Sequence, residues 1–289
     1  MSLADARLAP RKRSASTGNI LRRTIAYAAL ILLALISLLP FAWMLSTSLK
    51  QSFEVFVFPP QWIPAELQWS NYTSLWTSFQ YWNLWIFNSF KIVAFAVVGQ
   101  LLFCSMSAYA FARLNFPGRD LIFYLYLGSM MVPDIVNTIP TYIMMQNLGL
   151  LDTHASLILP ALASAIGIFM LRQFFLSLPR ELEEAARVDG AGYWRIYWDI
   201  ILPLSKPALA TFAVFLFIWT WSDFLGPLIY LSTDSKFTLP VGLALLNDQY
   251  NSDWERLMAG NVVGLIPLVI VYAAAQRYIV QGIALTGIK

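Results

Sequence analysis

The sequence is poor in residues on which many enzymes and secreted domains depend. It has one cysteine, Cys104, and one histidine, His154, which excludes an internal disulfide and clusters of cysteine or histidine around a metal. Charged residues make up only 12% of the chain and hydrophobic residues 58%, while the net charge is +3. A soluble globule needs more polar surface than this composition provides. The composition therefore predicts a membrane protein.

Motifs that bind nucleotides or metals, or that present a catalytic nucleophile, are also missing. The chain contains no GxxxxGK[ST] phosphate-binding loop, no HExxH, no CxxC and no GxSxG. Its carboxylates are scattered, without the local pairing that acid–base catalysis uses. We therefore expect a chain that is not an enzyme, that binds no metal or cofactor, and that depends on a separate subunit for any use of ATP.

Six apolar runs are each long enough to cross a bilayer as a helix, which takes about 20 residues. This predicts an all-α membrane protein with six transmembrane helices. Residues 1–23 form a basic tail, and the run that follows is too long for a signal-peptide core. A membrane span directly after the tail argues against a nucleic-acid-binding arm. The predicted spans are 24–45, 86–112, 121–145, 155–175, 208–231 and 257–276.

Basic residues indicate the orientation, because positive charge gathers on the cytoplasmic side of membrane proteins. An even number of spans places both termini on one face. Of the 19 lysines and arginines, 14 fall in segments on that face, and Arg172 lies near the same end of the fourth span. The four on the other face are Lys50, Lys91, Lys236 and Arg256. The termini and the long polar segment 177–207 are therefore predicted to be cytoplasmic. On the outer face, the many tryptophans between residues 46 and 85 predict an interfacial belt.

Two predicted spans carry polar side chains that lipid would leave unsatisfied. In the third span, four of them recur at i, i+3, i+4 and i+7 and so share one helical face. In the fifth span, a tryptophan, a serine and an aspartate are predicted to share a face with Gly226, ahead of a kink at Pro227. Both sets either line a translocation pathway or join helices to one another. These candidates are Asp134, Asn137, Thr138, Thr141, Trp219, Ser222 and Asp223.

The polar segment 177–207 is the only long stretch that reads as an amphipathic helix–turn–helix in water. Three glutamates stand in its first turn, where the helix dipole favours negative charge, and Glu183 can pair with Arg187 four residues later. Gly190 and Gly192 end the first helix, and a second helix follows until Pro203. A hairpin tethered to membrane spans at both ends is suited to binding a soluble partner.

Within this segment, seven residues match the EAA motif of ABC importer permeases at its fixed spacings. They are Glu184, Ala185, Ala186, Gly190, Ile200, Leu202 and Pro203. Other stretches resemble the maltose-type carbohydrate importers, in particular the smaller six-span permease of the pair; these are residues 108–120, 139–160, 221–228 and 276–289. The clearest departure is Ser222, where relatives commonly carry asparagine.

The resemblance implies the type I permease fold of ABC importers, with a cytoplasmic coupling-helix hairpin between the fourth and fifth spans. It also implies a bacterial inner-membrane location and three kinds of partner: a second permease in a heterodimer, a dimer of ATPase subunits that bind ATP and Mg²⁺, and an extracytoplasmic solute-binding protein. Glu184 would meet a basic residue of the ATPase, while Ala185 and Ala186 would permit close approach. Residues 281–289 would lie against the ATPase, and residues 239–260 would face the binding protein. The solute would be a di- or oligosaccharide, a polyol or a glycerol phosphate ester.

Two other classes of function remain open from the sequence. A secondary transporter driven by protons or sodium would use Asp134 and Asp223 as its coupling carboxylates. A membrane scaffold without transport activity would use the polar hairpin only to anchor a soluble protein.

Overall fold

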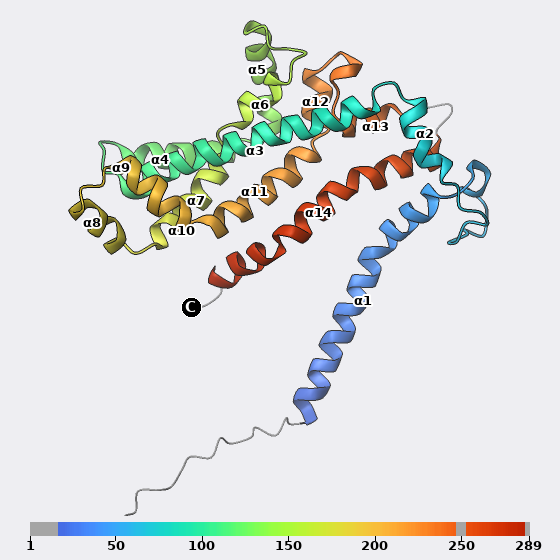
Figure 1. The fold of residues 1–289 in the computed structure, drawn as a ribbon, viewed down its shortest axis with the longest axis horizontal. Coiled ribbons are helices and arrows are strands. Elements are labelled where there is room, and N and C mark those ends of the chain that lie inside the picture. Colours follow the sequence, from blue (N-terminus) through green and yellow to red (C-terminus); the bar gives the residue numbers. More distant parts are fainter. Residues whose placement is uncertain (1–16, 247–252, 287–289) are drawn as a thin grey trace, which may run out of the picture.

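The computed structural model describes residues 17–246 and 253–286, and within these ranges it contains helices and no strands. Figure 1 shows α3, α11 and α14 running in roughly the same direction, with the small helices α8 and α9 at one end and α2 and α13 toward the other. The longer helices are α1 (Thr17–Ser48), α3 (Trp82–Arg113), α4 (Arg119–Gly128), α5 (Asp134–Asn147), α7 (Ala165–Ser177), α11 (Lys206–Trp221) and α14 (Trp254–Thr286).

Short helices and turns connect them. The short helices are α2 (Ser70–Ser78), α6 (Ala155–Ala161), α8 (Glu181–Val188), α9 (Tyr193–Ile196), α10 (Leu202–Leu204), α12 (Leu225–Tyr230) and α13 (Leu239–Leu245). Single turns of 3₁₀ helix occur at Ser52–Glu54, Ser129–Met131 and Asp234–Lys236. Residues Tyr197–Ile201 form a π-helical turn.

Helix α3 is the centre of the packing. It contains no proline, so its backbone hydrogen bonds continue without a break over 32 residues. Helices α7 and α11 pack along it, and α14 packs against both α11 and α1. One apolar cluster surrounds the end of α3 near α8, with Cys104, Ala108 and Ala112 among its members. A second cluster surrounds the opposite end, with Trp82 and Trp85 at its centre.

Within residues 17–246 and 253–286, four helices are long and apolar enough to cross a membrane, and counting two strongly bent helix pairs as one span each raises the number to six. One pair is 119–131 with 134–147, bent by 102°, and the other is 193–204 with 206–221, bent by 76°. The first bend falls at Pro133, because the residue before a proline is forced out of the helical region and Val132 is extended. The predicted run 121–145 is therefore not one continuous helix.

Several helix ends differ from the runs read in the sequence. Helix α11 ends at Trp221, so Ser222 and Asp223 lie in the connection to α12 and do not share a helical face with Trp219 and Gly226. The break therefore precedes Pro227. Helix α14 continues to Thr286, ten residues beyond the predicted end, and residues 17–23 of the predicted tail are helical. Residues 1–16 of that tail lie outside the described residues.

The predicted belt of tryptophans divides into two groups. Trp62, Trp69 and Trp76 expose about half or more of their surface, as residues at a membrane interface do. Trp82 and Trp85 instead are buried in the second apolar cluster, so for these two the interfacial prediction is wrong. They fill the space between α3, α13 and α14 because large aromatic side chains bury more apolar area than any others.

Helix α1 stands apart from the other long helices. It meets the rest of the molecule near its C-terminal end and diverges toward its N-terminal end (Figure 1). Its large apolar side chains between residues 21 and 41 are exposed. An apolar stripe of this kind requires lipid or another helix as its surroundings.

Candidate functional site

The candidate site is the polar hairpin at the α8 end of the molecule, residues 181–204, which comprises α8, α9, the π-helical turn and α10. Helix α8 carries Glu181, Glu183 and Glu184 in its first turn, where the positive end of the helix dipole stabilises them. Helix α8 ends at Val188, and the chain turns at Gly190, whose φ of 81° lies in the left-handed region that glycine adopts at low cost. The Ala191 N–H then donates to the Ala186 carbonyl at 2.9 Å, which closes the helix end.

Helix α8 has an inner and an outer face. Glu183 is buried and Ala186 packs against the first apolar cluster, so these residues face the body. Glu184 and Ala185 are exposed, and Val188 exposes 88% of its surface. The outer face therefore combines small and apolar side chains with carboxylates, which is a surface suited to contact with another protein.

Glu183 is paired with Arg113, the last residue of α3. Arg113 Nε lies 2.9 Å from Glu183 Oε1, and the two side chains are only 3% and 7% exposed. Neither atom has a hydrogen-bond partner, so this contact is an ion pair without hydrogen-bond alignment. The same guanidinium donates from Nη2 to the carbonyls of Phe175 and Leu178, at the end of α7. One arginine therefore joins α3, α7 and α8.

The second half of the hairpin is held by Tyr197, in the π-helical turn. Its hydroxyl lies 2.7 Å from the hydroxyl of Ser105, and its ring lies 5.4 Å from the ring of Tyr109, centroid to centroid. A π turn redirects the following side chains by one residue, and such turns are common at functional sites. Ile196 and Ile201 on either side are buried in the first apolar cluster.

The seven motif residues all lie in this hairpin, but their surroundings differ. Glu184, Ala185 and Pro203 are exposed, and Gly190 makes the turn after α8. Ala186, Ile200 and Leu202 are half-buried, and Ala186 and Leu202 pack on the first apolar cluster.

The predicted pairing of Glu183 with Arg187 is wrong. Glu183 turns inward to Arg113, and the Arg187 guanidinium instead lies over the ring of Tyr193, 5.0 Å from its centroid. A buried carboxylate needs a cation that is itself removed from water, and Arg187 is exposed. The spacing of residues along α8 gave no indication that Glu183 pairs with Arg113, which lies 70 positions earlier in the chain.

The candidate pathway residues lie on two elements. In α5, Asp134 and Asn137 are exposed, whereas Thr138 and Thr141 are half-buried. Beyond the end of α11, Ser222 is exposed, and Asp223 is half-buried and accepts a hydrogen bond from the Gly226 N–H at 3.2 Å.

Helix α5 meets α12, which directly follows the second group of residues, through a pair of aromatic rings. Tyr142 of α5 stacks on Tyr230 of α12, with centroids 6.2 Å apart. Trp219, in the last turn of α11, leaves 77% of its surface uncovered. The pathway role of these residues remains a prediction.

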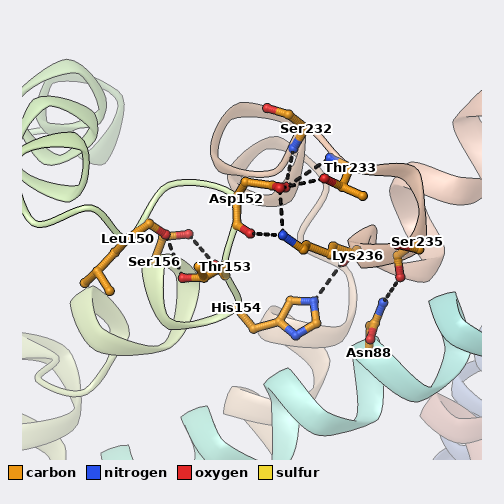
Figure 2. Close-up of polar contacts among 10 residues, drawn as sticks. All are labelled: Asn88, Leu150, Asp152, Thr153, His154, Ser156, Ser232, Thr233, Ser235 and Lys236. Carbon is orange, nitrogen blue, oxygen red and sulfur yellow. Dashed lines mark hydrogen bonds and ion pairs between the residues drawn. The ribbon is translucent and has the colours of Figure 1, made fainter.

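A second polar cluster, away from the hairpin, joins two connecting loops (Figure 2). Asp152 accepts hydrogen bonds from the backbone N–H groups of Ser232 and Thr233, and Lys236 Nζ lies 2.7 Å from its carboxylate. His154 Nε2 donates to the Lys236 carbonyl at 2.8 Å. Asn88 of α3 donates to the Ser235 carbonyl at 2.9 Å, so the loop is also tied to α3.

The electrostatics of this cluster favour one charge state for each group. The hydrogen bond to Lys236, followed by those from Thr233 and Ser232, lowers the pKa of Asp152 well below its usual range. Burial lowers the pKa of His154, and this outweighs the opposing effect of its hydrogen bond to the Lys236 carbonyl. Both shifts favour an ionised aspartate beside a neutral histidine. Within the described part of the chain, no three histidine, cysteine or acidic side chains gather as a metal site requires.

Sequence reasoning missed Arg113, Tyr197 and this loop cluster. Arg113 falls at the end of an apolar run, where an arginine usually marks only the membrane interface. Asp152 has a φ of 55°, and the left-handed region is one that aspartate enters more often than most residues, but nothing in the sequence indicated it.

Comparison with known proteins assigns a family. Residues 100–285 match the family described as the binding-protein-dependent transport system inner membrane component, and that range includes the whole hairpin. Since the match spans most of the chain, this protein belongs to that family.

Individual relatives agree with the assignment. The chain is 36% identical over 269 residues to the arabinooligosaccharides transport system permease protein AraQ of Halalkalibacterium halodurans, covering 92% of this chain and 95% of the relative. It is 34% identical to the diacetylchitobiose uptake system permease protein NgcG of Streptomyces coelicolor, with 94% and 91% covered. It is 39% identical to the sn-glycerol-3-phosphate transport system permease protein UgpE of Yersinia enterocolitica, with 80% and 84% covered.

A solved structure has the same fold. A chain of a bacterial ABC transporter involved in the import of the acidic polysaccharide alginate superposes with a TM-score of 0.80 at 27% identity. The superposition covers 91% of this chain and 98% of that chain. The expected resemblance to ABC importer permeases and their all-helical fold is thereby confirmed.

Proposed function

We propose that this chain is the transmembrane permease subunit of an ATP-driven importer that takes up a carbohydrate or a related polyhydroxylated solute. The observation that carries this proposal is the hairpin 181–204, which presents an exposed acidic and apolar face while its inner face is anchored to the membrane helices. Family membership supports the same conclusion. The proposed partners are a second permease, a dimer of ATPase subunits and an extracytoplasmic solute-binding protein.

The hairpin is the proposed docking site for the ATPase. Val188 and Leu182 are apolar side chains exposed on the outer face of α8, and Glu184 lies beside them. A carboxylate at the edge of a dry contact is well placed to be oriented by one arginine of a partner. ATP and Mg²⁺ would be bound by that partner, and this chain would bind no cofactor of its own.

Transport would proceed by alternating access. Closure of the ATPase dimer would move the hairpin, and helices α3 and α7, which Arg113 joins to it, would move with it. Such changes usually occur as rigid-body shifts between two packing arrangements. In this mechanism the hairpin end is cytoplasmic, which agrees with the distribution of basic residues.

The solute class follows from the relatives. Their names describe permeases for arabinooligosaccharides, diacetylchitobiose and sn-glycerol 3-phosphate, and the solved structure belongs to an alginate importer. All of these solutes carry hydroxyl groups on adjacent carbons or along a sugar chain. The side chains proposed to face the pathway, including Asn137, Thr141 and Trp219, provide hydrogen-bonding groups and an aromatic ring suited to such solutes.

The test is affinity purification of the tagged full-length chain from its native membrane in mild detergent, with ATP hydrolysis measured on the eluate. We expect a second permease and an ATPase to co-purify. Glu184→Lys should then lower the recovered ATPase or its hydrolysis several-fold, because it reverses the charge that faces the partner.

Glu181→Lys, a charge reversal at the start of the same helix, is the matched control and should have the smaller effect. A chain that elutes without ATPase activity would contradict the proposal and favour the secondary transporter. In that case an uncoupler would abolish uptake, and Asp134→Asn would reproduce the loss. A chain with no solute flux in any reconstitution would instead be a scaffold.

A further inference from the structure

The inner face of the hairpin is attached to a single face of α3. Ser105, Tyr109 and Arg113 follow one another at intervals of four residues, so they form one stripe along this helix. The stripe contacts the hairpin twice, through Tyr197 in the π-helical turn and through Glu183 in α8. Residues outside the EAA motif therefore determine where the motif lies.

From this geometry we propose that Arg113 is a positioning residue, which acts through Glu183 to fix α8 against the ends of α3 and α7 and so transmits movement between the hairpin and these helices. This inference rests on the proposed function. It goes further by assigning the mechanical link to a pair of residues that are buried within this chain.

Three features of Arg113 favour this role over that of an ordinary ion pair. Its side chain is almost fully buried, so its charge is not screened by solvent. Its guanidinium contacts α8 through Nε and two carbonyls at the end of α7 through Nη2. Arginine alone offers donors in a fixed planar fork, which permits contacts with two elements at once.

The residue next to Glu183 explains why the orientation of α8 matters for docking of a partner. Glu183 faces inward, and Glu184 is the next residue and faces outward. A rotation of α8 about its axis would therefore turn Glu184 and Ala185 away from a docked partner. The exposed pair Arg195–Asp199 on the same hairpin, with side chains 74% and 63% exposed and 3.4 Å between Nε and Oδ2, makes no such link.

Hydrogen–deuterium exchange on the full chain, purified in mild detergent with its partners, tests the proposal. We expect Glu183→Gln to accelerate exchange of the backbone amides of residues 184–188 about tenfold. Exchange within the central part of α3 should stay unchanged. Arg113→Lys should have a similar effect, because a lysine retains the charge but lacks the fork. Asp199→Asn is the matched control and should leave exchange of these amides within twofold of the unsubstituted chain.

ATP hydrolysis by the same samples, with MgATP as the probe, separates positioning from simple stabilisation. We expect Glu183→Gln to lower hydrolysis several-fold while the recovery of the folded chain stays the same. Unchanged exchange would overturn the proposal, and so would faster exchange with unchanged hydrolysis. If Arg113→Lys does not fold, the exchange and hydrolysis measured for Glu183→Gln still test the proposal. If no ATPase co-purifies even with the unsubstituted chain, the proposed function fails, whereas the exchange result still reports on the link itself.

Discussion

Individual residues in this protein have roles that depend on backbone conformation as much as on side chains. Gly190 is the clearest case, because its φ of 81° lets the chain turn back directly after α8. A side chain there would have space, since nothing lies within 4 Å of an added Cβ. The left-handed conformation itself costs a residue with a Cβ roughly 1–2 kcal/mol.

We therefore expect Gly190→Ala to destabilise the hairpin by about 1 kcal/mol, which corresponds to roughly fivefold faster exchange of amides in residues 184–196. Gly192→Ala is the control, because Gly192 has an ordinary φ of −76° and also has open space around an added Cβ. Equal exchange in the two variants would show that the turn does not require the left-handed conformation.

Pairs of elements are held together by close contacts that leave no room for an extra methyl group. Helix α13 approaches α3 so closely that a Cβ on Gly242 would lie 2.2 Å from Cε3 of Trp85. The indole cannot easily withdraw, because its Nε1 donates to the Asp234 carbonyl at 2.8 Å and its ring is buried. The contact between α13 and α3 therefore depends on glycine.

Gly242→Ala is expected to lower stability by about 1–3 kcal/mol through overpacking, seen as a lower midpoint of thermal unfolding in detergent. Gly128→Ala provides the comparison, since nothing lies within 4 Å of its added Cβ and its φ of −57° is helical. That variant should unfold at the same temperature as the unsubstituted chain or slightly above. A midpoint for Gly242→Ala equal to that of Gly128→Ala would contradict the close approach.

At the scale of the whole molecule, stability should depend on pH through the loop cluster around Asp152. Burial lowers the pKa of His154 in the folded chain, whereas an unfolded chain protonates this histidine near its ordinary pKa of about 6.5. Below that pH the unfolded state binds more protons than the folded state, so folding weakens as the pH falls. Above it, His154 is neutral in both states and its contribution is constant.

The midpoint of thermal unfolding should accordingly fall more between pH 7 and pH 5 in the unsubstituted chain than in His154→Gln. The glutamine amide can still donate to the Lys236 carbonyl but does not titrate. Parallel pH profiles for the two chains would contradict a lowered pKa of His154 in the folded state. The depressed pKa of Asp152 acts in the same direction, and its contribution is lost only in more acidic solution.

Much of this structure could be predicted from local sequence, and the rest depends on contacts between distant residues. The apolar runs indicated membrane helices, and the fixed spacing from Glu184 to Pro203 indicated the family. Breaks in the helices were harder to place, because Pro133 lies at a break between two helical segments whereas Pro140 and Pro267 lie inside helices whose neighbours tolerate them. The ion-pair partner of Glu183 could not be predicted from neighbouring residues. Whether Glu183 pairs with Arg113 or with Arg187 depends on which side of α8 is buried.

The unbroken course of α3 also determines where this molecule can bend. At about 1.5 Å per residue its 32 residues span roughly 48 Å, from the aromatic cluster around Trp82 to the guanidinium of Arg113. Among the described residues, the other long helices α1, α11 and α14 each contain a proline, and the chain bends between α4 and α5 and leaves the helical conformation between α11 and α12. We therefore expect α3 to move as a rigid body, whereas its neighbours can bend at their prolines and breaks. A displacement at one end of α3 is then transmitted almost fully to the other end.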